Sequence, residues 1–186
     1  MNLLEDELIR LRAPEPEDLE VMYEMENMPE LWEVGCTTQP YSRHLLRQYL
    51  EQSANDLYAD RQLRLVVTAK ADSQVLGMAD LTAFDPLHGR AEVGMAVRAG
   101  YRQKGVGRRA LTLLCRYAFG FLHLHQLYAC IPADNEGSLR MFVGCGFMRQ
   151  AVLKEWLSAD SQTAVGYGAT YYKDAVLVQR INEEKV

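Results

Sequence analysis

Residues 101–111 read YRQKGVGRRAL, and this basic turn with two glycines decides the fold that we predict for the chain. The residues before it, 91–97, are mostly small or β-branched, which is typical of a buried strand. The residues after it carry apolar side chains at helical spacing, from Ala110 to Phe121. The sequence therefore predicts a strand that runs into a glycine-bearing turn, and the turn opens a helix.

A turn of this composition is suited to bind an anion. Gly105 and Gly107 carry no Cβ atom, so the backbone can approach a ligand closely. The first amides of a helix have no partner within the helix and point outward. Because such amides commonly hold phosphate groups, the turn predicts a phosphate-containing ligand.

The spacing of the glycines narrows the choice of motif. A P-loop needs an earlier glycine and a Ser or Thr after a lysine, and both are missing here. A dinucleotide-binding fingerprint is only half matched, because no acidic residue follows where the ribose would be bound. The pattern that fits is Arg-x-x-Gly-x-Gly, which spans Arg102, Gly105 and Gly107. It resembles the acetyl-coenzyme A loop of the GNAT N-acetyltransferases, although a basic helix entry without a ligand would read the same.

Residues 134–147, DNEGSLRMFVGCGF, carry a second signature. They follow the apolar run 127–131, and either Asp134 or Asn135 can cap the helix that they open. Gly146 suits the left-handed position just after a helix end. An Asn after a strand, a short helix and a Gly-Phe pair resemble the other GNAT signature. Because both segments occur in this order, the chain is identified as a member of the GNAT family.

The remaining pattern predicts one α/β domain over residues 1–186, without a linker or an internal repeat. Helices are expected after Pro16 and Ser42, after the basic turn and after Asn135, and strands at 8–11, 64–69, 75–83, 91–97, 126–131, 147–156 and 171–181. The resemblance implies a mixed, twisted sheet with helices on both faces. It also implies that the sheet splays between its fourth and fifth strands, where the pantetheine arm of acetyl-coenzyme A would lie.

Composition excludes several other classes of protein. A net charge of −5 argues against nonspecific nucleic-acid binding, and no run of 18 apolar residues predicts a membrane span. The acidic N-terminus lacks the features of a signal peptide, and no Cys, His or carboxylate cluster has the spacing of a metal site. Cys115, Cys130 and Cys145 sit in apolar runs, which predicts buried, reduced thiols and a cytoplasmic protein. We therefore expect no metal, no nucleic acid and no membrane partner.

The resemblance implies which residues would hold acetyl-coenzyme A. Backbone amides of the turn would surround the pyrophosphate, and the charges of Arg102 and Lys104 would assist them. The residues of this group are Arg102, Gln103, Lys104, Gly105, Val106, Gly107 and Arg108. The backbone of the fourth strand, at Met95, Ala96 and Val97, would run along the pantetheine and the thioester, and Asn135 would bond the arm from the fifth-strand side. For the side chains of Lys104, Arg108 and Arg109, a solvated basic turn is an equal alternative.

Glu92 is the candidate general base. It lies on the predicted fourth strand and faces the same way as Gly94 and Ala96, two small residues that leave room for a substrate. A carboxylate there could take a proton from an ammonium group directly or through a water. The alternative is a carboxylate that is solvated or paired with Arg90 or Arg98.

The chain departs from the family pattern at Phe142. Many GNAT proteins carry a tyrosine there, whose hydroxyl protonates the departing thiolate, and phenylalanine cannot donate a proton. Either another group or water replaces it, or none is needed because a thiol is a fair leaving group. The candidate replacements are Tyr128, Tyr167, Tyr171 and Tyr172.

The resemblance places the acceptor opposite the cofactor, against Trp32, Glu33, Tyr41 and residues 158–172. Glu33 and Asp80 could substitute for Glu92 as acceptor-binding carboxylates. The acidic early helix would suit a diamine or polyamine, although a solvated acidic face is the commoner reason for such a pattern. The function expected is acetyl transfer from acetyl-coenzyme A to a primary amine in a ternary complex. The alternatives are acetylation of a peptide N-terminus, and a sensor that binds acyl-coenzyme A without catalysis. Family members often form homodimers, for which the last strand and Trp156 are candidate interface elements.

Overall fold

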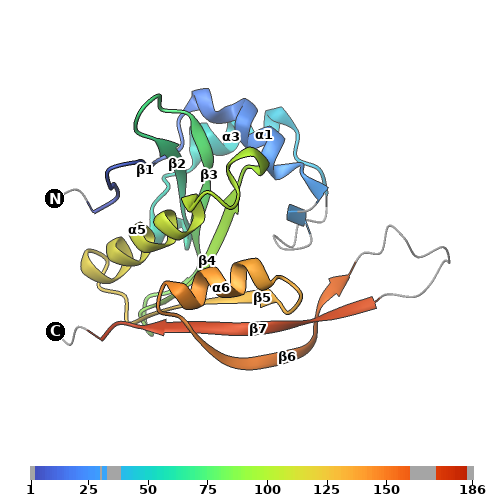
Figure 1. The fold of residues 1–186 in the computed structure, drawn as a ribbon. Coiled ribbons are helices and arrows are strands. Elements are labelled where there is room, and N and C mark those ends of the chain that lie inside the picture. The colour runs from blue at the N-terminus through green and yellow to red at the C-terminus, as the bar shows by residue number, and fades with distance from the viewer. Residues whose placement is uncertain (1–2, 30, 33–38, 160–170, 184–186) are drawn as a thin grey trace.

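In the computed structural model, residues 3–29, 31–32, 39–159 and 171–183 are described, and their strands form one seven-stranded mixed sheet (Figure 1). The order across the sheet is β1-β2-β3-β4-β5-β7-β6. The strands are β1 (Ile9–Arg12), β2 (Leu63–Ala69), β3 (Val75–Asp85), β4 (Arg90–Val97), β5 (Gln126–Pro132), β6 (Met148–Ala159) and β7 (Tyr171–Ile181). The helices are η1 (Pro16–Asp18), α1 (Leu19–Glu26), α3 (Arg43–Gln52), α4 (Leu57–Asp60), η2 (Ala99–Tyr101), α5 (Val106–Gly120) and α6 (Glu136–Gly144).

The predicted strands and main helices are confirmed, with differences at their ends. β3 runs two residues beyond the predicted end at Ala83, because Ala83 has a φ of +47° and its bulge lets the ladder resume at Asp85. Phe147 was predicted to begin β6, but it is buried against Phe142 and the strand begins one residue later. The short helix α4 was not predicted, since four residues capped by Asp56 give too weak a pattern.

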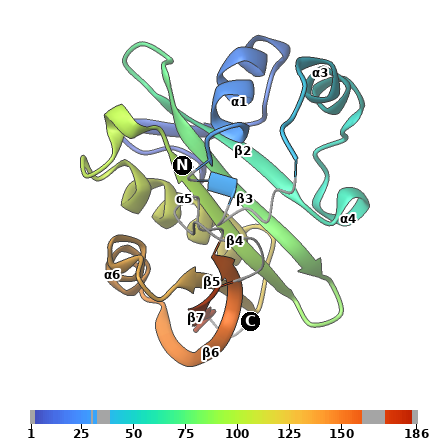
Figure 2. The same cartoon turned by 90° about the vertical axis from the view of Figure 1, so that its right-hand side faces the viewer.

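Helices cover both faces of the sheet, as the fold class predicts (Figure 2). On one face, α5 buries Ala110, Leu111 and Leu114 in the main core against the strands. On the other face, α1 and α3 form a smaller core of Met22, Met25 and Leu46 with Met78 of β3. Ser42 caps α3 as predicted, because its side chain accepts a hydrogen bond from the amide of Leu45 at 3.1 Å.

The parallel pair β4 and β5 stays together over three residue pairs only, from Arg90↔Gln126 to Glu92↔Tyr128. Beyond Glu92, β4 continues against β3 as far as Val97, whereas β5 continues against β7 as far as Pro132. The two strands therefore diverge, which confirms the predicted splay (Figure 1). Backbone groups that face the split have lost the strand that would have paired with them.

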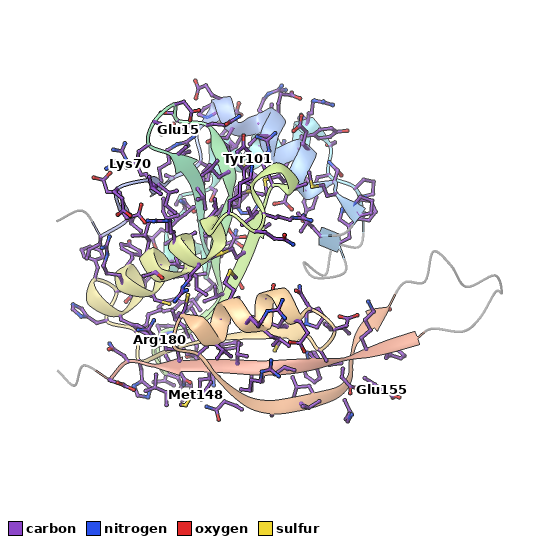
Figure 3. The ribbon with its side chains drawn as sticks, in the orientation of Figure 1. Glu15, Lys70, Tyr101, Met148, Glu155 and Arg180 are labelled. Atoms are coloured by element: carbon purple, nitrogen blue, oxygen red, sulfur yellow. The ribbon has the colours of Figure 1, made fainter. Side chains whose placement is uncertain are left out.

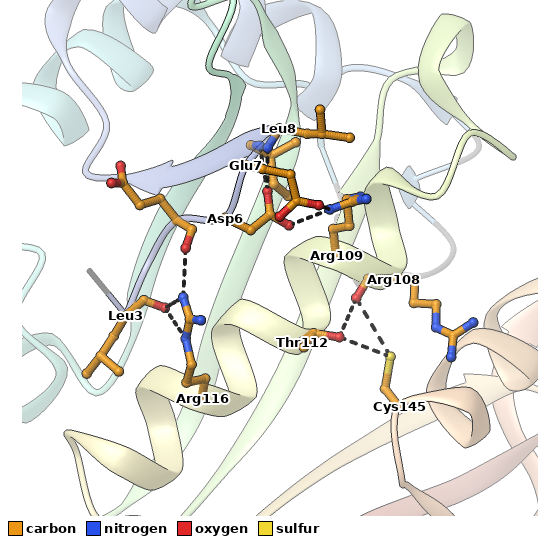
Figure 4. A network of polar contacts seen from close by, with 11 residues as sticks. Leu3, Asp6, Glu7, Leu8, Arg108, Arg109, Thr112, Arg116 and Cys145 are labelled. Atoms are coloured by element: carbon orange, nitrogen blue, oxygen red, sulfur yellow. Dashed lines mark hydrogen bonds and ion pairs between the residues drawn. The ribbon is translucent and has the colours of Figure 1, made fainter. Parts of the chain in front are cut away.

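The N-terminal segment is bound to α5 by two arginines (Figure 4). Arg109 donates to the carboxylates of Asp6, at 2.9 Å, and Glu7. Arg116 donates to the backbone oxygens of Leu3, at 2.7 Å, and Glu5, at 2.8 Å. Arg109 is thus engaged on the side of α5 that faces the N-terminal segment, which leaves it a poor candidate for a ligand of the basic turn.

Arg180 links β7 to the helices α5 and α6, toward which its side chain points (Figure 3). Its guanidinium donates to the carbonyl of Cys145 at 2.8 Å, just after α6. The same group lies 5.4 Å from the centre of the Phe119 ring in α5. Gly146, the residue after Cys145, has a φ of +87°, which is the left-handed conformation predicted for it.

Gly107 is required by helix packing. A Cβ atom there would lie 2.7 Å from Sδ of Met141 in α6. We expect Gly107→Ala to gain nothing in stability in the wild type, because the helix-forming advantage of alanine is offset by displacement of Met141. In a Met141→Ala background the same change should raise the free energy of unfolding by about 0.5 kcal/mol. Urea denaturation of the four proteins of this cycle measures the coupling, and equal effects in both backgrounds would contradict the packing role.

Candidate active site

A cavity of about 430 Å³ occupies the split between β4 and β5. β3 and β4 form one wall, and β5 with α6 forms the opposite wall. Residues from α1, and the described residues that follow it up to Tyr41, close a third side. Because the cavity is bounded by the edges of both diverging strands, the splay of the sheet creates it.

The cavity brings together residues that the sequence assigned to different roles. Glu92, Met95, Ala96 and Asn135 line it, and so do the predicted acceptor residues Trp32, Tyr41 and Asp80. Val97 and the turn from Arg102 to Arg108 lie outside its lining, at the adjoining end of β4. Glu33 and residues 160–170 fall outside the described residues. Cys130 is half-buried rather than buried as predicted, because it lines the same cavity.

The basic turn has an unusual backbone. Gln103 has a φ of +59° and Gly105 a φ of +82°, so two left-handed residues flank Lys104. Gly105 occupies the N-cap of α5, where it offers no side chain to the first amides. A Cβ atom on Gly105 would meet no protein atom within 4 Å. Left-handed residues beside a helix start turn successive amides into an anion-binding concavity, so this turn fits a phosphate group.

The arginines of the turn are partly used by the protein itself. Arg102 donates from Nε to the carbonyl of Val97 at 2.9 Å, which folds it back onto the end of β4. Arg108 donates to the carbonyl of Gly144 at 3.3 Å, at the end of α6. Arg109 is bound to Asp6 and Glu7, whereas the ammonium of Lys104 lies 5.7 Å from the centre of the Tyr101 ring. The backbone amides at the start of α5, together with Lys104, are therefore available to an anion.

Asn135 caps α6, which settles the choice between it and Asp134. Its Oδ1 accepts a hydrogen bond from the amide of Ser138 at 3.1 Å, whereas Asp134 pairs with Lys173 at 3.3 Å. Since Oδ1 serves the cap, Nδ2 is the group of Asn135 that can donate to a carbonyl in the cavity.

Glu92 stands in the cavity wall at the last pair before the strands diverge. Burial raises the pKa of its carboxyl, and the backbone N–H of Cys130 opposes that rise. The two arginines that could have neutralised Glu92 are engaged elsewhere. Arg90 pairs with Asp85 at 3.2 Å and Arg98 with Glu24 at 3.6 Å. Within the described part of the chain, Glu92 has no cationic partner, which favours the general base over the ion-paired alternative.

A second charged group in the cavity was not recognised from the sequence. Arg64 of β2 donates from Nε and Nη2 to Asp80, at 3.1 and 2.9 Å, and from Nη1 to Glu26 of α1. Burial would lower the pKa of Arg64, but Asp80 and Glu26 outweigh that effect and raise it. The signal for this group was available, because period-two alternation places Arg64 on the face of the sheet that its partner Asp80 shares.

Phe142 is only 4% exposed and lines the cavity, so the ring stands where a proton donor was expected. Ser138 lines the cavity one helical turn earlier and offers a hydroxyl on the same face of α6. Of the tyrosines named as replacements, Tyr128 lies outside the cavity lining and Tyr172 is 56% exposed. Tyr167 and the side chain of Tyr171 lie outside the part of the chain that the structure describes.

The described residues contain no group of three or more His, Cys, Asp or Glu side chains placed to hold a metal ion. None of their helices combines the length and the apolar character that crossing a membrane would require.

Comparison with known proteins agrees with this geometry. Residues 9–148 match the family described as "Acetyltransferase (GNAT) domain". A curated relative, the spermidine N(1)-acetyltransferase of Escherichia coli (strain K12), is 26% identical over 140 residues, which are 75% of this chain and 72% of that protein. The chain belongs to the GNAT acetyltransferase family and is an N-acetyltransferase.

Two solved structures share the fold. The spermidine N-acetyltransferase from Vibrio cholerae in complex with CoA and spermine has a TM-score of 0.78 at 21% identity, covering 95% of this chain and 97% of that one. The ribosomal-protein-S5-alanine acetyltransferase from Vibrio fischeri also has a TM-score of 0.78 at 21% identity, covering 97% and 96%. The two neighbours have the same TM-score and the same identity to this chain, so fold similarity does not distinguish a polyamine acceptor from a protein acceptor.

We expect Glu92→Gln to stabilise the protein at neutral pH but not at low pH. Burial holds the pKa of Glu92 above its unfolded value, so the folded state binds this proton more tightly than the unfolded state. The ionised carboxylate therefore lowers the free energy of unfolding above its folded pKa, and this penalty vanishes below the unfolded pKa. Denaturant unfolding of both proteins, above and below the ordinary pKa of glutamate, measures the difference. A difference that does not change with pH would argue against a buried, titrating Glu92.

Proposed function

We propose that this N-acetyltransferase transfers the acetyl group of acetyl-coenzyme A to a primary amine of a cationic small molecule, of the diamine or polyamine class. The observation that carries the proposal is the cavity at the split, with Glu92 in its wall and the open start of α5 beside it. The relatives named as spermidine acetyltransferases support an amine acceptor.

Acetyl-coenzyme A supplies an activated thioester when it is bound. The amides at the start of α5 would hold its phosphates, and Gly105 leaves the space for them to approach. The edge of β4 from Val93 to Val97, opposite which no described strand pairs on the side of the split, would donate to carbonyl groups along the cavity. Asn135 would contribute its Nδ2 from the opposite wall. These donors are fixed by the fold, so they are in place before the reaction begins.

Glu92 would prepare the acceptor. An amine is protonated at neutral pH and must lose a proton before it can attack a carbonyl carbon. A carboxylate whose pKa is raised by burial is a stronger base than an exposed one. Because no cation of the described residues neutralises Glu92, its charge also attracts the ammonium group. Removal of the proton and binding of the acceptor thus depend on one side chain.

Ser138 is our candidate to stabilise the leaving thiolate. Phe142 cannot donate a proton, whereas the hydroxyl of Ser138 faces the same cavity from the same helix. Since a thiol leaves readily, this contribution should be small.

Acetylation of a peptide N-terminus is the second candidate, and the ribosomal-protein acetyltransferase among the structural neighbours is the observation that favours it. Membership of an acetyltransferase family favours both enzymatic functions over the sensor alternative. The predicted cytoplasmic location fits the free thiols Cys115 and Cys145. Trp156 is 60% exposed on the edge strand β6, and a homodimer through this region remains a prediction.

The first test is release of coenzyme A, followed with a thiol reagent. Acetyl-coenzyme A is offered with putrescine, spermidine, free amino acids and short peptides that have free N-termini. We expect turnover with the diamine and the polyamine. Turnover with peptides alone would move the assignment to protein acetylation, and no turnover with any amine would contradict the proposal.

Glu92→Gln should lower kcat/KM by about 10²- to 10⁴-fold, the usual contribution of a positioned base. Binding of acetyl-coenzyme A, measured by calorimetry, should stay unchanged. In the wild type, kcat/KM should rise with pH through a pKa above the usual value for glutamate. This rising part of the pH profile should be missing in the variant. A variant that retains both the activity and this rising part would remove Glu92 from the mechanism.

Ser138→Ala should lower kcat by about tenfold or less, because the thiolate needs little help. Phe142→Tyr restores a hydroxyl one turn away and should recover the loss in the double variant. Phe142→Leu serves as the control without a hydroxyl. If Ser138→Ala binds acetyl-coenzyme A normally and keeps the wild-type kcat, Ser138 gives no proton to the thiolate.

A further inference from the structure

The cavity carries an excess of negative charge. Its lining includes the carboxylates of Glu26, Asp80 and Glu92 and a single guanidinium, that of Arg64. When all four groups are ionised, the described lining has two more negative than positive charges. A cavity with this balance attracts cations and repels carboxylates.

Arg64 is not free to receive a carboxylate from a ligand. Three of its donors are used, two on Asp80 and one on Glu26, and its side chain is 23% exposed. Arg64 therefore holds the carboxylate of Glu26 in position beside that of Asp80. When all three groups are ionised, they together retain one negative charge.

Glu26 is placed to use that charge on a ligand. One carboxylate oxygen, Oε1, accepts from Arg64, and for Oε2 no partner occurs among the described residues. The side chain is 15% exposed and lines the cavity. A desolvated carboxylate oxygen of this kind forms strong hydrogen bonds with an ammonium group.

Two aromatic residues line the cavity with Glu26, and the backbone around them is held in place. The indole Nε1 of Trp32 donates to the carbonyl of Glu26 at 2.8 Å. Asn27 binds both backbone groups of Tyr41, accepting from its amide at 2.9 Å and donating to its carbonyl at 3.0 Å. Aromatic rings beside a carboxylate form a common binding arrangement for organic cations.

We propose that Glu26, Trp32 and Tyr41 form a subsite for a second ammonium group of the acceptor, whose first amine reacts beside Glu92. Arg64, which holds Glu26, is aligned through Asp80 with Gly94 and so lies two strands across and two residues along the sheet from Glu92, which corresponds to about 12 Å between their backbones at the usual strand dimensions. The acceptor is thus a linear molecule with two cationic nitrogens and no carboxylate. This inference rests on the proposed function, and it assigns a specificity role to Glu26.

The test compares putrescine with n-butylamine, which has the same carbon chain and one nitrogen fewer. Calorimetry measures binding of each to the wild type and to Glu26→Gln. We expect Glu26→Gln to weaken putrescine binding by about 10- to 100-fold, the loss expected for a charge-assisted hydrogen bond, and to leave n-butylamine unaffected. Glu24→Gln is the matched control on the same helix, because Glu24 is 59% exposed and pairs with Arg98 outside the cavity lining.

Two further measurements test whether the effect of Glu26→Gln comes from lost folding stability, and whether the aromatic ring of Trp32 contributes to binding. Glu26→Gln should keep its melting temperature near that of the wild type, because Arg64 retains both bonds to Asp80. Trp32→Leu removes the ring but not the carboxylate and should weaken putrescine binding by about 2- to 10-fold. Equal binding of putrescine by the wild type and Glu26→Gln, or equal affinities of the wild type for the two amines, would overturn the subsite. Selective binding of putrescine without acetyl transfer would support the subsite and contradict the proposed function.

Discussion

The structure depends on the point at which β4 and β5 stop pairing. β4 stays bound to β3 up to Val97, and β5 stays bound to β7 up to Pro132, so the two halves of the sheet must part after Glu92. Gly77 of β3 is needed for the close pairing of β3 with β4, because a Cβ atom there would collide with the carbonyl of Ala96 and push β4 away from β3. Among the strands that the structure describes, none pairs with β4 beyond Glu92 on the side of the split, and a ligand that pairs with its backbone there would extend the sheet.

The same split determines the electrostatics of the site. Glu92 and Asp80 lie on adjacent strands and on one face of the sheet, yet their surroundings differ. Asp80 accepts two hydrogen bonds from Arg64, whereas burial raises the pKa of Glu92, which has no cation of its own among the described residues. Two carboxylates with opposite environments can take different roles. One helps to hold the wall of the cavity together, and the other can exchange a proton.

Much of the fold could be predicted from the sequence, because strand and helix periodicity and two capping signals mark its elements. The Gly146 turn and the Ser42 and Asn135 caps are local features that a few residues determine. The position of Gln103 in the left-handed region was not predictable, since only the surrounding fold can impose that backbone on a glutamine. The partners of Arg64 and Arg109 also depend on contacts across 38 and 103 residues of sequence, which no local pattern contains.

The two parts of the proposed site therefore differ in how they are encoded. The phosphate-binding turn that we propose at the start of α5, beside the cavity, would rely on backbone amides and on the open space at Gly105, so a short motif suffices to identify it. The end near α1 relies on the side chains of Glu26, Trp32 and Tyr41, which come from separate segments and meet only through tertiary contacts. Side chains can change while the fold persists, and neighbours of 21% identity carry names with different acceptors on one architecture. Acceptor choice in this chain must then follow from its own cavity-lining charges, among which Arg64 joins Glu26 of α1 to Asp80 of β3.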